Sequence, residues 1–430
     1  MGVALLKASR GLPHELSSGC EDAQASTCSA LSVERVTELS TFLALQPVWN
    51  KLCDEAGIDY PFLRYEWVRT WWECFGAEKE LFVLLVKSGQ EIIAIAPLML
   101  SRGRMYGIKV RRLEFISNVH TPRFDFIITR QPDDVYRAIW TYLVGCRTLW
   151  DVLVLSQLPA GSRTLDELPR LAAEERFLGG LWRSGNSPYV PLRGTWDGYI
   201  NGLHRKHRSN LRNRLKRLSR RGEVAVETIA TIEHAASALT DGLLLEAAAW
   251  KGAAGTAICC RPEVRQFYTK LAERAAACGW LRLHFLTLDH QRIAFQYSMF
   301  CRNKLYLLKP GYDPAYAAYA PSSLLCYFVL RDAFAHGVAE HDFLGIAEPW
   351  KLEWTLETRP HACLFVFARL WRLRALYSIK FRLVPMVRQS RLYPPLRNIV
   401  VKLMARADGR GHKLKPDLQR SPGLGGICCR

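Results

Sequence analysis

The same succession of expected elements occurs twice along the chain, and this repetition restricts the possible fold more than any other sequence feature. Apolar, β-branched runs at 81–86 and 91–100 flank a polar turn and predict a hairpin, and a second hairpin is predicted at 280–301. Helical patterns precede each hairpin, and a helix and a buried strand follow each one. A chain of 430 residues also exceeds what one compact core usually holds. We therefore predict two α/β (α+β) domains, although no residue-level repeat is visible.

Composition places the boundaries of these domains. Residues 1–33 are rich in Ser, Gly, Ala and Cys without periodicity, so a flexible lead-in is expected there. The first domain is predicted at 34–190 and the second at 191–360. From residue 361 the composition shifts to Arg with Leu, Tyr, Val and Pro, which predicts a basic tail over 361–430. Helices are expected at 36–56, 64–75, 133–143, 203–221, 241–250, 262–278 and 322–336, and further strands at 112–117, 125–129, 151–155, 305–308 and 341–345.

The formal charge of +19 is concentrated in two segments, because 203–221 holds nine Lys or Arg and no acid, and 361–430 has a net charge of +13. The rest of the chain is nearly neutral. Leucines at helical spacing predict that 203–221 is a helix, whose cations suit phosphate. A solvated basic face explains the same run equally well. No aromatic residue interrupts it, so stacking of single-stranded bases is not encoded and nucleic acid is not an expected partner.

Several classes of protein are excluded by composition and spacing. Hydrophobic residues make up 49% and charged residues 23%, as in soluble globular proteins, and no run reaches the roughly 18 apolar residues of a spanning helix. Thirteen scattered cysteines without a C-x-x-C pair favour neither a disulfide framework nor a metal site. The first ten residues do not form the apolar core of a secretion signal, so we expect a cytoplasmic protein with free thiols. A nucleophilic triad is not indicated, because no G-x-S-x-G occurs.

Four segments of the second half together resemble one enzyme family. In this sequence they read EAAAWKGAAGTA at 246–257, LLKPGYD at 307–313, YAPSSLL at 319–325, and DFLG at 342–345 followed by Lys351 and Trp354. Their order and spacing resemble GNAT-superfamily acetyltransferases of the BioF2-like or CelD-like type, associated with cellulose and exopolysaccharide synthesis. These proteins are similar in architecture to the FemAB peptidoglycan aminoacyl ligases, which pair two GNAT-like domains. The resemblance covers about residues 35–360.

The resemblance implies tandem GNAT-like domains, each a mixed twisted sheet flanked by helices. It implies transfer of an acyl group, acetyl in the first place, to an amine or hydroxyl of a sugar or cell-envelope precursor. The implied co-substrate is acetyl-CoA or another acyl-CoA, and no metal is implied. A tRNA-dependent aminoacyl ligase of FemAB type is one alternative, although the sequence does not contain the long coiled-coil arm usual there. The other is a non-catalytic nucleic-acid-binding protein that uses the basic segment 203–221.

The turn before the helix at 322–336 is the expected acyl-CoA site. Backbone N–H groups and the positive end of a helix attract pyrophosphate. The family usually has Gly where this chain has Ser322; serine keeps the backbone N–H but restricts the dihedral angles. From the residues alone, an ordinary helix start is the simpler explanation. The expected contacts are Tyr319, Ser322, Ser323 and Leu324.

The candidate catalytic residues are Lys351, Asp125 and Asp313. Lys351 is suited to holding a substrate phosphate or to stabilising an oxyanion, and a surface lysine lying over Trp354 is the alternative. Asp125 ends a T-P-R-x-D segment that resembles one in the family's first domain, where a carboxylate would accept a proton. The alternative is a carboxylate that pairs with Arg123 or caps the end of a strand. For Asp313 an Asx turn is the simpler explanation. The expected acceptor-binding residues are Trp250, Lys251, Arg205, Arg208, Tyr312 and Trp354.

The basic tail has its own pattern. Aromatic and aliphatic residues from Phe365 to Tyr377 alternate with arginines, which predicts a basic amphipathic helix. Such a helix suits an anionic membrane surface, where each basic residue contributes roughly 1 kcal/mol. Packing against the domains is the alternative for its first half, and disorder is expected from Ala407 to Arg430. We therefore expect peripheral contact with the inner face of a membrane.

Overall fold

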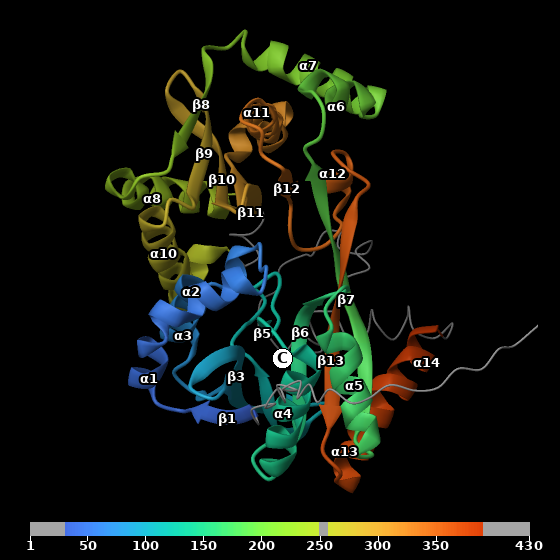
Figure 1. Ribbon diagram of the computed structural model, residues 1–430. Helices are drawn as coiled ribbons and strands as arrows, with labels where there is room; N and C mark the ends of the chain where they lie inside the picture. Colours follow the sequence, from blue (N-terminus) through green and yellow to red (C-terminus); the bar gives the residue numbers. More distant parts are fainter. Residues whose placement is uncertain (1–30, 249–256, 390–430) are drawn as a thin grey trace, which may run out of the picture.

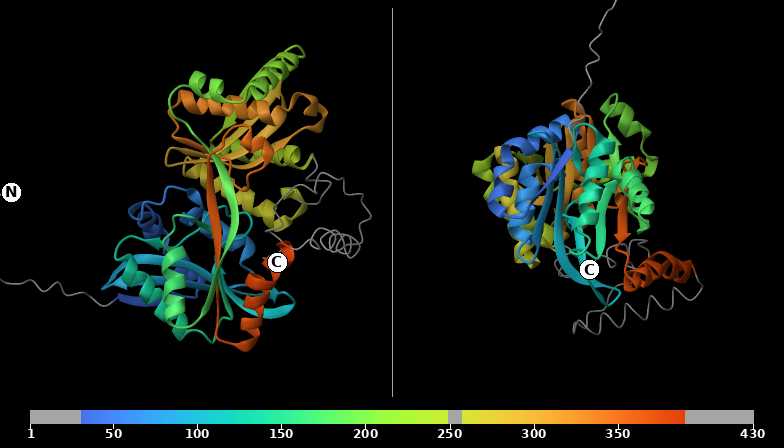
Figure 2. Two further views of the ribbon diagram at one scale, coloured as in Figure 1. Left: turned by 90° about the vertical axis from the view of Figure 1, so that its right-hand side faces the viewer. Right: turned by 60° about the horizontal axis from the view of Figure 1, so that its bottom comes forward.

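A single mixed sheet of thirteen strands runs through the whole molecule, flanked by helices (Figures 1 and 2). The computed structural model describes residues 31–248 and 257–389. The strand order is β1-β2-β3-β4-β6-β13-β7-β12-β11-β10-β9-β8, with β5 paired to β3. The predicted α/β class, with a twisted mixed sheet flanked by helices, is confirmed.

The first half contains three antiparallel strands, a helix and a parallel strand. The strands β2 (Glu80–Ser88), β3 (Glu91–Met105) and β4 (Ile108–Phe115) are antiparallel, and β6 (Val152–Pro159) returns parallel to β4 after helix α4 (Pro132–Gly145). The hairpin predicted from the apolar runs is the β2–β3 pair. The other elements of this half are β1 (Leu31–Val36), α1 (Leu39–Ala44), α2 (Gln46–Glu55), the short turn η1 (Pro61–Leu63), α3 (Tyr65–Phe75), β5 (Ile127–Ile128) and α5 (Thr164–Glu174).

The second half repeats this arrangement. Strands β9 (Leu281–Leu288), β10 (Gln291–Cys301) and β11 (Lys304–Tyr312) are antiparallel, and β12 (Glu340–Asp342) runs parallel to β11 after helix α11 (Pro321–Ala335). The second predicted hairpin is therefore β9–β10. The other elements are α6 (Trp196–Gly202), α7 (Arg205–Leu218), β8 (Val224–Ile229), α8 (Ile232–Ala248), η2 (Ile258–Cys260), α10 (Pro262–Ala277), η3 (Pro314–Tyr319) and α12 (Pro349–Leu352).

Two long strands join the halves. In β7 (Leu178–Pro191), residues up to Pro188 pair with β13 (Thr358–Phe367), and the last three residues pair with β12. On its other side β13 pairs with β6 of the first half. Figure 1 shows β7 and β13 running side by side from one half to the other. The domain boundaries predicted near 190 and 360 therefore fall inside or at the end of strands that belong to both halves.

The strand β13 corrects the prediction for the tail. An amphipathic helix was expected from Phe365, but Phe365, Val366 and Phe367 are buried in the sheet, and the first tail helix, α13, spans Trp371–Ser378. A π-helical turn (Ile379–Leu383) and α14 (Val384–Gln389) follow. Apolar residues next to one another in sequence suit a strand covered on both faces, which explains the difference.

Part of the tail packs against the first half. Lys380 is buried, and its ammonium lies 4.0 Å from the ring centre of Phe365 and 4.6 Å from that of Trp182. Trp371, in contrast, is 83% exposed. Residues 390–430 lie outside the described part, as does the lead-in up to residue 30. Contact of the tail with a membrane stays a prediction.

Helices α3 and α10 connect the two halves through ion pairs. The carboxylate of Glu73 on α3 lies 2.8 Å from Arg274 and 2.9 Å from Lys270, both on α10, and 2.9 Å from Arg69. Burial alone would raise the pKa of Glu73, but the three cations outweigh it and lower the pKa to about 2.

From the lowered pKa of Glu73 we predict that the stability of the protein depends on pH. Since the pKa is lower in the folded than in the unfolded chain, Glu73 stabilises the protein above pH 4.5, and that contribution is lost as the pH falls towards 2. We expect Glu73→Gln to lower the free energy of unfolding at pH 7 by about 1–2 kcal/mol, after allowance for solvent screening. Thermal unfolding of both proteins from pH 7 to pH 2.5 tests this. The two melting temperatures should converge below pH 4.5, and a constant difference would contradict the prediction.

Candidate active site

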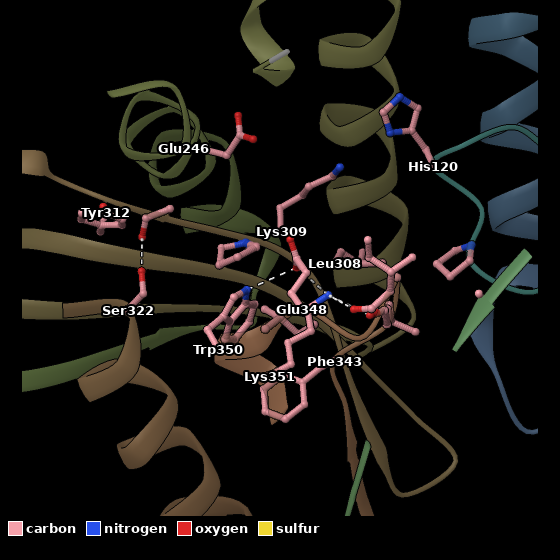
Figure 3. Close-up of a pocket in the computed structure, with 18 of the residues that line it drawn as sticks. His120, Glu246, Leu308, Lys309, Tyr312, Ser322, Phe343, Glu348, Trp350 and Lys351 are labelled. Atoms are coloured by element: carbon pink, nitrogen blue, oxygen red, sulfur yellow. Dashed lines mark hydrogen bonds and ion pairs between the residues drawn. The ribbon is translucent and has the colours of Figure 1, made fainter. Parts of the chain in front are cut away.

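A cavity of about 690 Å³ opens where the parallel strands β11 and β12 separate. Their pairing ends at Tyr306 and Asp342. Beyond this point β11 continues along β10, whereas the chain after Asp342 turns away through Phe343 and Leu344, which line the cavity. Residues of the first half, including His120 and Gln157, close the other side. Figure 3 shows the cavity with the side chains that project into it.

The predicted carrier loop lies at this cavity. Ala320 adopts a left-handed conformation (φ +47°) and is followed by Pro321 at the first position of α11. The first-turn residues Ser322 and Ser323 line the cavity, and the hydroxyl of Ser322 lies 3.5 Å from the carbonyl oxygen of Gly311. Pro321 has no N–H, and the N–H of Ser323 donates to the carbonyl oxygen of Ala320 (2.9 Å), so this turn offers an anion the N–H of Ser322 and the positive end of the helix.

Two of the four expected carrier contacts do not reach the cavity. Leu324 is fully buried in the hydrophobic core of the second half. The ring of Tyr319 is not part of the cavity wall and lies 5.2 Å from the guanidinium of Arg217 on α7.

A β-bulge in β11 shapes the middle of the cavity. Tyr297 of β10 stands opposite Lys309, and Ser298 stands opposite Leu307, so Leu308 is an extra residue in β11. A bulge leaves its extra residue outside the ladder of hydrogen bonds. Leu307, Leu308 and Lys309 all line the cavity. The peptide group at Leu308 is therefore placed where a ligand can meet it.

Lys351 is held rigidly in the opposite wall. It is buried, and its ammonium donates hydrogen bonds to the carbonyl oxygens of Leu344 (2.9 Å) and Ile346 (3.2 Å). An ion pair with Glu348 (3.0 Å) completes the contacts that fix it. Figure 3 shows Lys351, Glu348 and Leu308 close together in the cavity.

The alternative of a surface lysine lying over Trp354 is wrong. The ring near the ammonium of Lys351 is that of Trp350, with 5.5 Å between the ammonium and the ring centre. Trp354 is buried, packs edge-on against His207 at 4.6 Å, and is not part of the cavity wall.

Sequence reasoning missed two residues on the cavity wall, Lys309 and His120. The ammonium of Lys309 lies 5.4 Å from the ring centre of Tyr268, and burial lowers its pKa, partly offset by the charge of Glu246. Burial, together with the charges of Lys309 and Arg261, lowers the pKa of His120 to about 3, so His120 is neutral at pH 7. A lysine inside an apolar strand, directly before Pro-Gly, was the signal in the sequence that could have identified Lys309.

Helix α8 touches β11 so closely that only glycine fits at position 311. A β-carbon added to Gly311 would lie 2.6 Å from the backbone nitrogen and Cα of Glu246. The side chain of Glu246 lines the cavity and accepts a hydrogen bond of 3.0 Å from the backbone N–H of Ile258. Because Gly311 has no side chain, α8 can approach β11 this closely, and this approach fixes the position of Glu246.

We expect Gly311→Ala to lower the free energy of unfolding by about 1–3 kcal/mol, because the backbone of α8 has to move away. The displacement of Glu246 should also weaken the binding of any ligand to this cavity. Urea unfolding and a ligand titration measure the two effects. Gly202→Ala is the matched control, since a β-carbon there meets nothing within 4 Å. Equal stabilities of the two variants would contradict this account of Gly311.

The two candidate aspartates take other roles. The hydroxyl of Thr164 donates to the Asp125 carboxylate (2.6 Å), and the backbone N–H of Phe126 also donates to it (2.8 Å). Burial raises the pKa of Asp125. The predicted pairing of Asp125 with Arg123 is wrong, because Arg123 pairs with Asp342. Asp313 accepts a hydrogen bond of 2.9 Å from the N–H of Ala315, which is the expected Asx turn at the start of η3. Neither carboxylate is part of the cavity wall.

The expected acceptor-binding residues are separated by the fold. Tyr312 lines the cavity. Arg205 and Arg208 lie on α7 away from it, and Arg208 donates to the side-chain oxygen of Asn201 (2.9 Å). Trp250 and Lys251 lie outside the described residues.

A second cavity of about 830 Å³ occupies the corresponding place in the first half. The pairing of the parallel strands β4 and β6 ends at Glu114 and Val154, and both residues line it. The second cavity shares four wall residues with the first, so the two lie next to each other. These shared residues are Val119, Gln157, Ser184 and Ile346.

The described residues contain neither a candidate metal site nor a membrane-spanning helix. No three His, Cys, Asp or Glu side chains of residues 31–248 and 257–389 are grouped as a metal site. Within the same residues, no helix has both the length and the apolar character needed to cross a membrane.

Comparison with known proteins identifies one family. A family model described as an acetyltransferase (GNAT) domain matches residues 205–352, which include the β11–α11 loop and Lys351. No curated protein matches the chain.

Several solved structures resemble this chain at low identity. The crystal structure of FemX is 12% identical, with a TM-score of 0.51, over 81% of this chain and 99% of that one. L-PGS from Bacillus licheniformis is 11% identical, with a TM-score of 0.46, over 80% and 96%. A tandem GNAT protein from the clavulanic acid biosynthesis pathway is 12% identical, with a TM-score of 0.41, over 78% and 98%. The family match and the strand order together make the second half of the chain a GNAT acetyltransferase-like domain.

Proposed function

We propose that the protein transfers an acyl group, acetyl in the first place, from acyl-CoA to an amine or hydroxyl of a sugar or cell-envelope precursor. One observation carries this proposal: the start of α11, the bulge at Leu308 and the ammonium of Lys351 all belong to the wall of one cavity. Acyl transfer from a thioester needs an anion site, an oxyanion donor and space for the acceptor. The start of α11 supplies the first, the bulge at Leu308 and Lys351 supply the second, and the cavity itself supplies the space.

The residues present fit acyl-CoA. The first turn of α11, with Ser322 and Ser323, would hold the pyrophosphate through the backbone N–H of Ser322 and the helix dipole. The edge of β11 beyond Tyr306 has left β12, so its peptide groups can bond to the amides of the pantetheine arm. A volume of about 690 Å³ is in the usual range for a site that encloses part of a small molecule.

In the proposed reaction, the nitrogen or oxygen of the acceptor attacks the thioester carbonyl carbon. A C–N or C–O bond forms, the C–S bond breaks, and the sulfur leaves as a thiolate that takes up a proton. The ammonium of Lys351 and the N–H of Leu308 would stabilise the charge on the carbonyl oxygen. Lys309, whose pKa burial lowers, faces the same cavity and is suited to accept the proton of the acceptor.

The acceptor would approach through the second cavity. Its walls combine the aromatic rings of Trp71, Trp182 and Phe365 with polar groups such as Glu114 and Gln157. Apolar ring faces together with hydrogen-bonding groups suit a sugar or a sugar-linked precursor. The motif resemblance to BioF2-like and CelD-like proteins supports the same class of acceptor.

Calorimetric titration of the full chain with CoA and acetyl-CoA tests the carrier. We expect micromolar affinity, weakened at least about tenfold in Ser322→Pro, which removes one N–H from the first turn of α11, where proline is sterically tolerated. Ser322→Ala is the matched control, because it keeps this N–H and loses only the hydroxyl.

Binding should be followed by thioester consumption in the presence of amino sugars or sugar-linked precursors. A folded protein that binds neither CoA nor acetyl-CoA would refute the proposal. If that protein instead used aminoacyl-tRNA as donor, the aminoacyl ligase alternative would be correct.

A further inference from the structure

Helix α7 forms one side of a positively charged groove. Its Leu211 and Leu218 are buried, and the helix contacts α11 and η3. Beside this contact lies a surface groove of about 600 Å³. Four of the described residues that line this groove are cationic and none of them is acidic. The described lining residues are Asn210, Asn213, Arg214, Lys216, Arg217, Arg220 and Ala318.

The four cations of the groove are not neutralised by the protein. Within residues 31–248 and 257–389, no carboxylate forms an ion pair with Arg214, Lys216, Arg217 or Arg220. Helix α5 provides a contrast, because its Arg170 pairs with both Glu167 and Glu174. Several unneutralised cations around one depression produce a positive potential that attracts an anion.

The turn η3 separates this groove from the active-site cavity. Ala317 lines the cavity, and its neighbour Ala318 lines the groove. Tyr319 connects η3 with α7, since its ring lies beside Arg217 and its hydroxyl oxygen accepts a hydrogen bond from Arg221. Ala318 is four residues from Ser322, so the groove lies at most about 14 Å along the chain from the start of α11.

We propose that this groove binds the 3′-phosphate of CoA and the adenosine that carries it. This inference rests on the proposed function, which places the pyrophosphate of the same molecule at the start of α11. A phosphate monoester is a compact dianion, and arginine recognises it through paired N–H donors. The groove is the size of a site for part of a small ligand. The residues from 203 to 221 contain no Phe, Tyr or Trp on which RNA bases could stack, which favours CoA over RNA.

Comparison of CoA with 3′-dephospho-CoA tests the assignment. We expect the full chain to bind CoA at least about tenfold more tightly than 3′-dephospho-CoA in calorimetric titrations. The double variant Arg214→Gln/Arg217→Gln should lose this preference and keep the affinity for 3′-dephospho-CoA. The matched control is Lys206→Gln/Arg212→Gln, which removes two exposed cations of the same helix that do not line the groove. It should keep the preference, since glutamine is a good helix former.

Three results would overturn the assignment. One is equal affinity of the unaltered chain for the two ligands. Another is a double variant whose affinities for CoA and for 3′-dephospho-CoA fall by the same factor. The third is a double variant that keeps the preference for CoA while losing affinity for tRNA, which would assign the groove to RNA. If the unaltered chain bound neither ligand, the proposed function itself would fail, so the two failures are distinguishable.

Discussion

Asp342→Ala is expected to lower the free energy of unfolding by about 3–5 kcal/mol, the largest change that we predict for one residue. Asp342 is fully buried and pairs with the buried Arg123 at 2.8 Å. Its carboxylate also lies 3.2 Å from Arg359 and accepts a hydrogen bond from the N–H of Leu344 (2.8 Å). Removal of the carboxylate would leave the Arg123 guanidinium buried without its counter-charge.

This ion pair matters for the site because its partners come from different halves. Arg123 lies in the loop after β4, and Asp342 ends β12 at the point where the cavity opens. Burial alone would lower the pKa of Arg123, but the charge of Asp342 outweighs it and raises the pKa. The loss of Asp342 should therefore also weaken CoA binding.

Urea unfolding of Asp342→Ala against the unaltered protein measures the effect. Asp332→Ala is the control, because Asp332 is an exposed residue of α11 that pairs with His336 four residues on. Its effect should stay within about 0.5 kcal/mol. In the double variant Arg123→Met/Asp342→Ala, the loss should be smaller than the sum of the single losses. A loss below 1 kcal/mol for Asp342→Ala would show that the pair does not hold the halves together.

The second large effect is expected on catalysis. Lys351→Met should reduce the rate of acyl transfer by about 10²–10³-fold while changing the affinity for CoA by only a few fold. The methionine keeps an unbranched side chain that is only one atom shorter, but it removes the charge that the carbonyl groups of Leu344 and Ile346 hold in the cavity wall. Interactions that strengthen as charge develops act on the transition state, so the rate should fall more than the binding.

Single-turnover transfer and CoA titration, both on folded protein, separate rate from binding. The two carbonyl groups left without their donor cost about 1–3 kcal/mol each, so the assay temperature must lie below the melting temperature of the variant. Glu348→Gln is the control for the neighbouring ion pair, because it keeps the ammonium and removes only the half-exposed carboxylate. An unchanged transfer rate in Lys351→Met would exclude Lys351 from the reaction.

Much of the secondary structure could be predicted because its signals are local. The hairpins β2–β3 and β9–β10 follow from apolar runs around polar turns. Helix α11 follows from Pro321 and the periodic residues after it. The cap of α6 is local too, since the hydroxyl oxygen of Thr195 accepts a hydrogen bond from the N–H of Gly198 (3.1 Å).

The ends of the helices and strands and the path of the tail could be predicted less well from the sequence. The helix expected at 36–56 is divided, since Val36 ends β1 and two helices follow at Leu39 and Gln46. Whether the apolar run around Phe365 forms a strand or a helix depends on which segments pair with it. The strands that pair with it, β6 and β7, are more than 170 residues away in sequence.

The candidate site divides in the same way. Sequence motifs identified Ser322, Ser323, Tyr312 and Lys351, and all four line the cavity. The structure was needed to find that His120 and Lys309 line the cavity. It was also needed to identify the partner of Arg123 and to show that Asp125 lies outside the cavity wall. No pattern within a segment encodes which distant side chain faces it.

The sequence by itself determined the class of fold, the two hairpins, the basic helix α7 and the segment that begins α11, because each depends on residues within about one helix or one hairpin. Only the tertiary structure decided that β7 and β13 join the halves and that a cavity opens where β11 leaves β12. It also decided that Arg123 and Asp342 pair across the two halves. The physical reason is that burial and ion pairing depend on distances in space, and these are set by the packing of the whole chain.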